Sequence, residues 1–421
     1  MLVFVEKITP RLIYTFDFVF KARGMDYSFC TSESQFEEST EISKLNYSLL
    51  KLNSSRIKPA SLLFEKEVEK QKLSKESFQG VESLSFDKVI DPIASVFYVL
   101  SRYEEYIDER RDRHGRFPFA QSILSEYNWT KNAICDRWAN EICSFLGLDI
   151  EKNQAPNIIP TFDIDNTYAY LYKDKKRQVL SVIKDLFSFN FKRIKERKKV
   201  LKTGEDPYDT FSRIKEIART FSHTKIFWLV GSDGKYDRNV PIDHPKHIEL
   251  IQELKTVAEI NLHPSYDSNS EMKKIQIEKK ELENVLGNEV SSSRQHFLKL
   301  DLTKTYKALI ENGFTNDYTM GFAEQAGFRA GTARSHQWFD LVNNEVTKLT
   351  IHPFVYMDGS LKEYMNLSIE ESKKRILDLY QEVQTYGGDF IFLWHNETIG
   401  DYAKWKGWSE VLNYTLALNN E

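Results

Sequence analysis

The stretch Asn157-Ile-Ile-Pro-Thr-Phe-Asp-Ile-Asp165 decides the fold class of this chain, because an apolar run ends there in two carboxylates. The residues from Asn157 to Phe162 predict a buried strand, and Asp163 and Asp165 stand where that strand would end. Alternate side chains of a strand share a face, so we expect both carboxylates to point to the same side of a sheet. Enzymes built on parallel sheets place their chemistry at that rim.

Two neighbouring carboxylates cost free energy unless a positive charge lies beside them. A divalent cation would meet this need, with one aspartate as its ligand and the other left as a base. An isolated Asp-X-Asp is also typical of a helix N-cap, with Asp165 or Asn166 capping the next helix. Residues further along the chain decide between the two interpretations.

The composition is that of an ordinary globular protein, with 421 residues of which 41% are hydrophobic and 29% charged. This length suffices for two domains. A net charge of -4 and a pI of about 6.2 argue against a nucleic-acid-binding protein. Three cysteines are too few for a disulfide framework, which fits a reducing compartment. The N-terminus has no signal-peptide pattern and no apolar run could span a bilayer, so we expect a cytoplasmic protein.

After Pro156 the chain alternates between predicted strands and predicted helices. Further strands are expected at 225–230, 258–262, 291–298, 314–320, 349–357 and 390–394. Helices are expected at 245–257, 271–285, 303–312 and 367–386. Such alternation is typical of a parallel sheet or a (β/α) barrel, and about seven strands with polar residues at their carboxyl ends favour the barrel. We therefore predict an α/β protein with a (β/α) barrel over residues 156–421.

Residues 1–150 are predicted to form a smaller N-terminal α/β domain of unknown role. A strand is expected at 2–5 and helices at 11–21, 94–107 and 138–146. We interpret Arg102, Glu104 and Glu105 as an exposed charged helix face, and residues 110–116 as a solvated loop.

A basic stretch extends from Lys173 to Lys202, with Phe187, Phe189 and Phe191 between the charges. Its composition fits an amphipathic segment that makes a peripheral contact with an anionic membrane surface or a polyanion. A solvated helical insertion explains the same composition, and we favour that interpretation.

Four more polar residues stand in or just after apolar stretches: His263 after AEINL, Arg294 in SSSRQHF, Asp317 in GFTNDYT and His395 after FIFLW. A lone histidine after a strand usually has a structural role. Four such groups together with the two aspartates predict one site instead.

In this order, the motifs TFDID, LHPSYDS, SRQHF, GFTNDYT and FLWHN resemble the polysaccharide deacetylase superfamily, carbohydrate esterase family four. The resemblance spans about residues 157–415. It extends to the whole chain for a Bacteroidetes-type subgroup, whose N-terminal part is similar to the FYVLSRYEEY segment. The resemblance implies a distorted (β/α) barrel with a divalent metal at its open end. It also implies a metal-dependent hydrolase that cleaves amide bonds and removes N-acetyl groups from a carbohydrate.

The resemblance also implies roles for single residues. Asp163 would be the general base, oriented by Arg294, and His395 would be the general acid. Asp165 and His263 would bind the metal. One further catalytic residue is expected at Asp317, which corresponds to the family's strand-end aspartate.

The second metal histidine of the family is missing, because its HxxxH motif reads His263-Pro-Ser-Tyr-Asp267 here. Asp267 either replaces that histidine or belongs to a surface turn. His296 and His352 are further ligand candidates, although a structural role is the favoured interpretation for each. Zinc is the expected metal, and a site with two carboxylates and one imidazole would also suit Mn, Fe or Co.

Two other functions stay open. The run Asp163-Ile-Asp-Asn-Thr167 also fits the DxDxT motif of haloacid-dehalogenase-type phosphatases, with Asp163 as nucleophile, Asp165 as acid and Ser232 as phosphate-binding residue. The other possibility is a barrel without catalysis that binds a glycan or a partner enzyme. Its aromatic platforms would be Trp394, Trp405, Trp408 and Tyr266.

Overall fold

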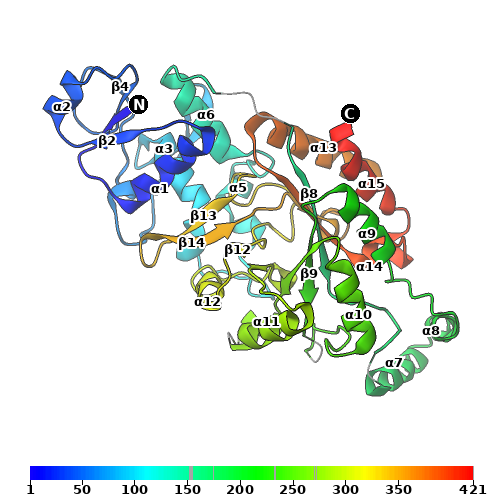
Figure 1. The fold of residues 1–421 in the computed structure, drawn as a ribbon. Coiled ribbons are helices and arrows are strands. Elements are labelled where there is room, and N and C mark those ends of the chain that lie inside the picture. Colours follow the sequence, from blue (N-terminus) through cyan, green and yellow to red (C-terminus); the bar gives the residue numbers. More distant parts are fainter. Residues whose placement is uncertain (151–154, 174, 232–233, 270, 272, 421) are drawn as a thin grey trace.

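The structure is a computed structural model that describes residues 1–421 except 151–154, 174, 232–233, 270, 272 and 421. Figure 1 shows a smaller part, made of the first 150 residues, packed against a larger part built around one curled sheet. Among the described helices, none is long and apolar enough to cross a membrane.

The smaller part contains two sheets. One is four-stranded and parallel, in the order β2-β1-β3-β4, and the other is an antiparallel meander, β5-β6-β7. The strands are β1 (Leu2–Phe4), β2 (Ser28–Cys30), β3 (Lys44–Asn46), β4 (Ser55–Arg56), β5 (Leu73–Phe78), β6 (Val81–Phe86) and β7 (Val89–Ile90). The helices are α1 (Pro10–Val19), α2 (Glu33–Glu38), α3 (Pro92–Leu100), α4 (Glu104–Ile107), α5 (Ile123–Glu126) and α6 (Ile134–Phe145).

The larger part is a nine-stranded sheet in the order β13-β14-β12-β11-β10-β9-β8-β16-β15. Its strands are β8 (Ile158–Ile164), β9 (Lys225–Leu229), β10 (Glu259–His263), β11 (Ser292–Ser293), β12 (Asn316–Asp317), β13 (His336–Asp340), β14 (Glu345–Ile351), β15 (Tyr356–Met357) and β16 (Phe390–His395). Its helices are α7 (Lys175–Phe187), α8 (Phe191–Thr203), α9 (Phe211–Thr220), α10 (Pro245–Leu254), α11 (Lys273–Leu286), α12 (Thr305–Glu311), α13 (Ile369–Tyr386), α14 (Asn396–Ile399) and α15 (Ser409–Ala417).

The sheet is a curled, open half-barrel, whereas the sequence predicted a distorted (β/α) barrel. All neighbouring strands are parallel except β13 and β14, which pair antiparallel. This hairpin leaves the barrel circle and packs against the smaller part, where Phe339 and Leu341 join its core and the Tyr14 hydroxyl donates to the Gln337 carbonyl. The sheet therefore ends at β13 on one side and at β15 on the other.

Strand alternation separates a helix-covered face of the sheet from a concave face. On β16, Phe390, Phe392 and Trp394 pack into the core beneath the helices. Ile391 and Leu393 point the other way, into a small core on the concave side. His395 has the same parity as Ile391 and Leu393, so the strand directs it to the concave side as well.

The charged side chains at the start of α4 are buried, although the sequence suggested that they form an exposed helix face. The predicted helix over 94–107 breaks after α3, because Arg102 adopts a left-handed conformation with φ of 55°. This turn directs Arg102 inward, where its Nε donates to Glu105 Oε1 at 2.8 Å. Glu105 also accepts from Arg329 Nη2 of the larger part at 2.7 Å. Burial would raise the pKa of Glu105, but Arg329 and Arg102 outweigh it and lower that pKa.

Removing Glu105 should destabilise the whole chain. In Glu105→Ala, Arg102 and Arg329 stay buried without their shared counter-charge, so we expect a loss of roughly 3–5 kcal/mol in the free energy of unfolding. Urea denaturation followed by circular dichroism measures it. Glu109→Ala is the matched control, because Glu109 is exposed and its loss should change stability by no more than about 0.5 kcal/mol. Equal effects of the two variants would show that the network does not join the two parts.

Candidate active site

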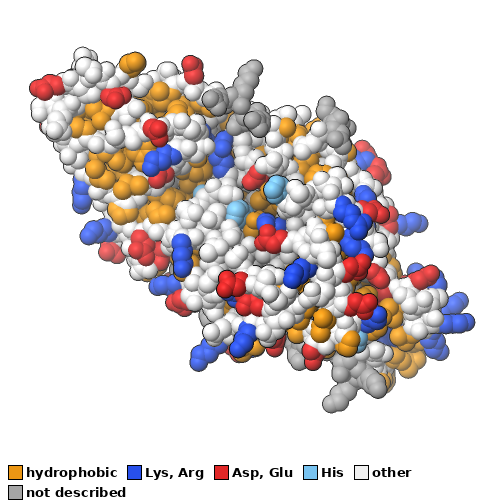
Figure 2. Space-filling view, in the orientation of Figure 1, with side chains coloured by type: hydrophobic (Ala, Val, Ile, Leu, Met, Phe, Trp, Pro, Cys, Tyr) orange, Lys and Arg blue, Asp and Glu red, His pale blue; other side chains and the backbone are white. Residues whose placement is uncertain are grey.

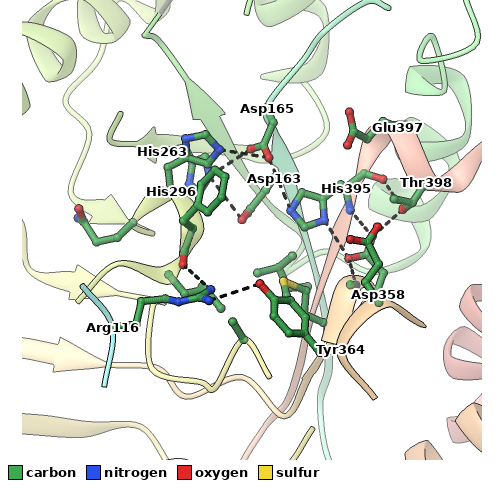
Figure 3. Close-up of a pocket in the computed structure, with 18 of the residues that line it drawn as sticks. Arg116, Asp163, Asp165, His263, His296, Asp358, Tyr364, His395, Glu397 and Thr398 are labelled. Carbon is green, nitrogen blue, oxygen red and sulfur yellow. Dashed lines mark hydrogen bonds and ion pairs between the residues drawn. The ribbon is translucent and has the colours of Figure 1, made fainter. Parts of the chain in front are cut away.

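The carboxyl ends of β8, β10, β11 and β16 converge on a pocket at the concave rim of the sheet (Figure 3). The cavity measures about 170 Å³. Sites that enclose a whole ligand typically measure about 300–1,000 Å³. The pocket is therefore suited to take one end of a larger molecule.

Asp163 occupies the floor of this pocket and is fixed by Arg294. Its Oδ1 accepts from Arg294 Nη1 at 2.9 Å, and both side chains are almost completely buried. Arg294 is itself fixed, since its Nε donates to the Tyr318 carbonyl at 3.0 Å and its guanidinium lies 4.3 Å from the centre of the Phe227 ring. Asp163 Oδ2 is thus left free of the arginine, 3.7 Å from His263 Nε2.

Two imidazoles, those of His263 and His296, direct their Nε2 atoms toward Asp165. His263 Nδ1 lies 2.6 Å from the Arg294 carbonyl, which can only accept, so Nδ1 carries the proton. His296 Nδ1 likewise lies 2.8 Å from the Asp237 carboxylate. In the neutral rings each Nε2 therefore presents a lone pair, and these atoms lie 3.2 Å and 3.4 Å from the two oxygens of Asp165. The Asp165 carboxylate needs a positive charge beside these nitrogens, which either a proton on His296 or a metal ion that all three groups bind would supply.

Asp165, His263 and His296 therefore form a cluster that could hold a metal ion. Their ligand atoms all lie within 4.8 Å of one another. Asp165 Oδ1 is buried and has no hydrogen-bond partner, although His263 Nε2 is near, which fits an oxygen that is directed at an ion. Burial would raise the pKa of Asp165, but the positive charge of His296, with His263 and His395, lowers it far below its usual value. Burial likewise opposes protonation of His296, and Asp165 and Asp237 outweigh it and raise its pKa to about 9.

The structure places His296, and not Asp267, beside Asp165 and His263. The Asp267 side chain is about half exposed, and its nearest ionic partner is Lys274 Nζ at 4.0 Å. Asp267 lies in a short helical turn, Tyr266–Asn269, and does not line the pocket. His352 is also elsewhere, where it binds Ser335 and Asn316. The third member of this cluster, His296, comes from the Arg-Gln-His turn after β11.

His395 faces Asp165 from the opposite side of the pocket. It stands directly across from Asp163 in the pairing of β16 with β8, and its Nε2 lies 3.8 Å from Asp165 Oδ2. Its Nδ1 lies 2.8 Å from Asp358 Oδ1. Thr398 and the His395 backbone amide donate to the other Asp358 oxygen. Burial alone would lower the pKa of His395, but Asp358, Asp165 and Asp163 raise it well above its usual value.

Asp317 supports the site without lining it. It is fully buried and accepts from Ser293 Oγ at 3.0 Å and from Thr319 Oγ1 at 2.8 Å. Thr319 Oγ1 in turn accepts from the Gln295 backbone amide, next to Arg294. Burial raises the pKa of Asp317 to about 6. This carboxyl group therefore holds the turn that carries Arg294 and His296, and the structure gives it no contact with the pocket.

The smaller part of the molecule also reaches the pocket, through the segment that the sequence suggested is a solvated loop. Arg116 is buried, lines the pocket and is paired with Asp112 at 2.7 Å. It donates to the Phe297 carbonyl and to the Tyr364 hydroxyl at the pocket rim (Figure 3). Phe297 has a φ of 61°, a strained conformation that is common at functional sites.

The aromatic platforms expected for a glycan-binding surface are mostly absent. Trp394 and Trp408 are buried in the core, and Tyr266 packs among His114, Tyr236 and Phe297. Trp405 does line the pocket.

Sequence reasoning missed Asp237, Asp358 and Glu397. Asp358 directly follows β15, so the rule that found His395 could have found it. Asp237 lies in the long connection after β9, where no periodic pattern indicates it. Glu397 lines the pocket, and burial together with the charge of Asp165 raises its pKa to about 7.

Residues 1–149 match a family of unknown function, DUF7033. No curated protein matches the chain. Among solved structures, the chain is similar to the crystal structure of a Mycobacterium smegmatis protein provisionally described as a polysaccharide deacetylase. That similarity covers 64% of this chain and 88% of the other, at 15% sequence identity and a TM-score of 0.40. At this level of similarity, the geometry of the site carries the functional argument.

The metal content of variants should show whether His296 or Asp267 is the third metal ligand. We expect His296→Ala and His263→Ala to lose most of the divalent metal that the purified chain retains, because each removes one of three ligands. Asp267→Ala is the matched control and should keep it. Elemental analysis of dialysed protein measures the content. Asp237→Asn keeps the ligand but removes its anionic partner, so we expect a metal affinity lower by about 10- to 100-fold.

A different result would reassign the ligands. If Asp267→Ala lost the metal while His296→Ala kept it, the ligand would be Asp267, as the sequence motif suggests. Circular dichroism of each variant establishes that the loss does not come from unfolding.

Proposed function

We propose that this protein is a metal-dependent hydrolase that removes N-acetyl groups from a carbohydrate. One observation carries the proposal: the Nε2 atoms of two imidazoles and the Asp165 carboxylate converge on one point. Asp163 lies beside that point, and the pair of His395 with Asp358 lies across it.

Asp165, His263 and His296 would hold the ion. A divalent metal bound there would polarise the amide carbonyl and lower the pKa of the attacking water. Two imidazoles and one carboxylate are a set that zinc hydrolases use, and Fe²⁺ also binds such a set when positions stay open. With His296 in place of Asp267, the donor set is softer than the sequence suggested, which favours zinc as the metal.

Asp163 would act as the general base. Arg294 occupies its Oδ1 and holds the carboxylate in one orientation, so the other oxygen is the one that can accept a proton from water. A carboxylate that is fixed in this way needs no reorganisation during the reaction. The acetyl carbon then gains a bond to the water oxygen, and the bond between that carbon and the sugar nitrogen breaks.

His395 would supply the proton that the leaving nitrogen needs. Asp358 fixes its Nδ1 proton, so Nε2 is the atom that faces the pocket. The raised pKa of His395 favours the protonated ring at neutral pH, which is the state that a general acid requires. The products would be acetate and a free amine on the sugar.

A phosphatase of the haloacid-dehalogenase type is less consistent with the site. Mg²⁺ prefers oxygen ligands, whereas three imidazoles surround Asp165. Ser232, the phosphate-binding residue of that interpretation, lies outside the described residues. The remaining alternative is a protein that binds a glycan without catalysis. The activity test below must distinguish it from the hydrolase.

Loss of either proton-transfer group should abolish most of the activity. We expect Asp163→Asn and His395→Ala each to lower the rate of acetate release by about 100- to 10,000-fold. Because neither is one of the three proposed ligands, metal content should stay unchanged. The assay is acetate release from N-acetylated oligosaccharides and sugar precursors with Zn, Mn, Fe and Co in turn. Binding of glycans without acetate release under any of these metals would identify a non-catalytic binder.

The pH profile should show the role of Asp358. His395 donates a proton, so the rate falls as the pH rises through the pKa of His395. Removing the anionic partner in Asp358→Asn lowers that pKa, and the falling limb of the kcat profile should move to lower pH. Thr398→Val, which removes only a hydroxyl that donates to Asp358, should move it less. An unchanged limb in Asp358→Asn would mean that another group, such as Glu397, provides the proton.

A further inference from the structure

The helices α7 and α8 form a hairpin that projects from the body of the molecule (Figure 1). The chain turns between them over Ser188–Asn190, where Phe189 has a φ of 52°. The proposed catalytic site does not use this element. The sequence alone left a surface contact open for this part of the chain.

The tip of the hairpin exposes three phenylalanines. Phe187 is 84% exposed, Phe189 78% and Phe191 62%. On the flanking helices Ile183, Leu186 and Leu201 are exposed as well. Single exposed apolar residues are common, but a contiguous group of them marks an interaction surface.

The exposed charged side chains of residues 178–203, as far as the structure describes them, are all basic. Seven basic side chains between residues 178 and 203 are exposed: Lys184, Lys192, Arg193, Lys195, Lys198, Lys199 and Lys202. The two acidic residues of the same range point inward. Asp185 is buried and paired with Arg197 at 3.1 Å, and Glu196 accepts from the hydroxyls of Tyr170 and Tyr402. Figure 2 shows the basic and apolar side chains gathered at this end of the molecule.

The hairpin is held in one orientation. Arg197 of α8 donates to the Gln178 carbonyl and to Ser181 Oγ of α7, so it ties the two helices together. Glu196 ties α8 to the body of the molecule, because it accepts from the hydroxyls of Tyr170 and Tyr402. The inward-facing charges therefore fix the hairpin and leave its tip free for a contact.

A cleft at the root of the hairpin extends the basic surface. It measures about 660 Å³, and Lys184, Arg193 and Arg238 line it together with tyrosines 168, 170, 208 and 402. The cleft reaches Asn166, the residue after Asp165. Positive charge thus continues from the hairpin to the edge of the catalytic rim.

We propose that the α7–α8 hairpin docks this protein on an anionic membrane surface. The phenylalanines of the tip enter the interface, and the lysines and arginines around them contact the lipid phosphates. An apolar tip flanked by basic residues is the pattern of an interfacial anchor, in which both contributions add. A polyanion in solution would use the charges but leave the three phenylalanines exposed. The proposal does not depend on the reaction proposed at Asp165, His263 and His296.

Co-sedimentation of the full chain with vesicles tests the docking. We expect binding to vesicles of phosphatidylcholine and phosphatidylglycerol in equal amounts, little binding to phosphatidylcholine alone, and weaker binding at high salt. The combined change Lys192→Glu, Lys195→Glu and Lys199→Glu should lower the partition coefficient by at least about 100-fold. Phe187→Ala, Phe189→Ala and Phe191→Ala together should lower it by at least about ten-fold.

Matched variants on the smaller part control for net charge and apolar area. Lys7, Lys51 and Lys88 are exposed there, and their combined change to Glu should leave most of the binding intact. Ile42→Ala with Leu49→Ala is the apolar control, since both side chains are exposed. Equal losses in the control and hairpin variants would overturn the proposal. Thermal melting of each variant excludes unfolding as the cause.

A label at the tip reports insertion directly. The three native cysteines are buried, so a polarity-sensitive dye should react selectively at Phe189→Cys. Its emission should shift to the blue when anionic vesicles are added. No shift, with binding to heparin that the phenylalanine changes leave unaltered, would identify a polyanion site instead. Light scattering that detects dimers through the tip in the absence of lipid would identify a second copy as the occupant and overturn membrane docking.

Discussion

The arginine of one strand end and the carboxylate of another meet at 2.9 Å, and the rest of the site depends on this buried ion pair. Arg294 and Asp163 are separated by 131 residues in the chain. Because both are buried, each would be costly to leave without the other. The pair therefore fixes the spacing between β8 and the turn after β11, and that turn carries His296. The backbone carbonyl of the same arginine also orients His263.

Some side chains of the site lie on strands, so the direction in which they point follows from strand periodicity. These could be predicted from the sequence. Asp163 and Asp165 were placed on one face by the period of two, and His395 by its position after a strand. The third candidate ligand could not be predicted in this way. His296 reaches the cluster through a turn with Phe297 in a left-handed conformation, and it depends on Asp237 from a distant connection. Local sequence patterns indicate neither this turn nor the contact with Asp237. The burial of Arg102 and Glu105 was missed for the same reason, since their partner Arg329 lies more than two hundred residues away.

The sheet was predicted as a distorted (β/α) barrel, and the structure shows a curled half-barrel that stays open for a physical reason. Counting strands cannot tell which of them turn away from the circle. Here β13 and β14 form an antiparallel hairpin whose apolar side chains pack with the smaller part of the molecule. The smaller part in return sends Arg116 to the rim of the pocket. Each part therefore contributes residues to the other. The first 150 residues help to shape the site and to stabilise it.

The position of His296 has a consequence for how related chains are judged. A comparison of the motif around His263 finds an aspartate four residues later, where the motif has its second histidine. It would therefore class such a chain as inactive. The structure shows that an imidazole can reach the same cluster from the neighbouring strand end, two residues after Arg294. A histidine that is missing from one motif can thus be matched by a candidate ligand at the end of a neighbouring strand. Sequences of this kind are better compared by the residues that surround one point in space than by the spacing within one motif.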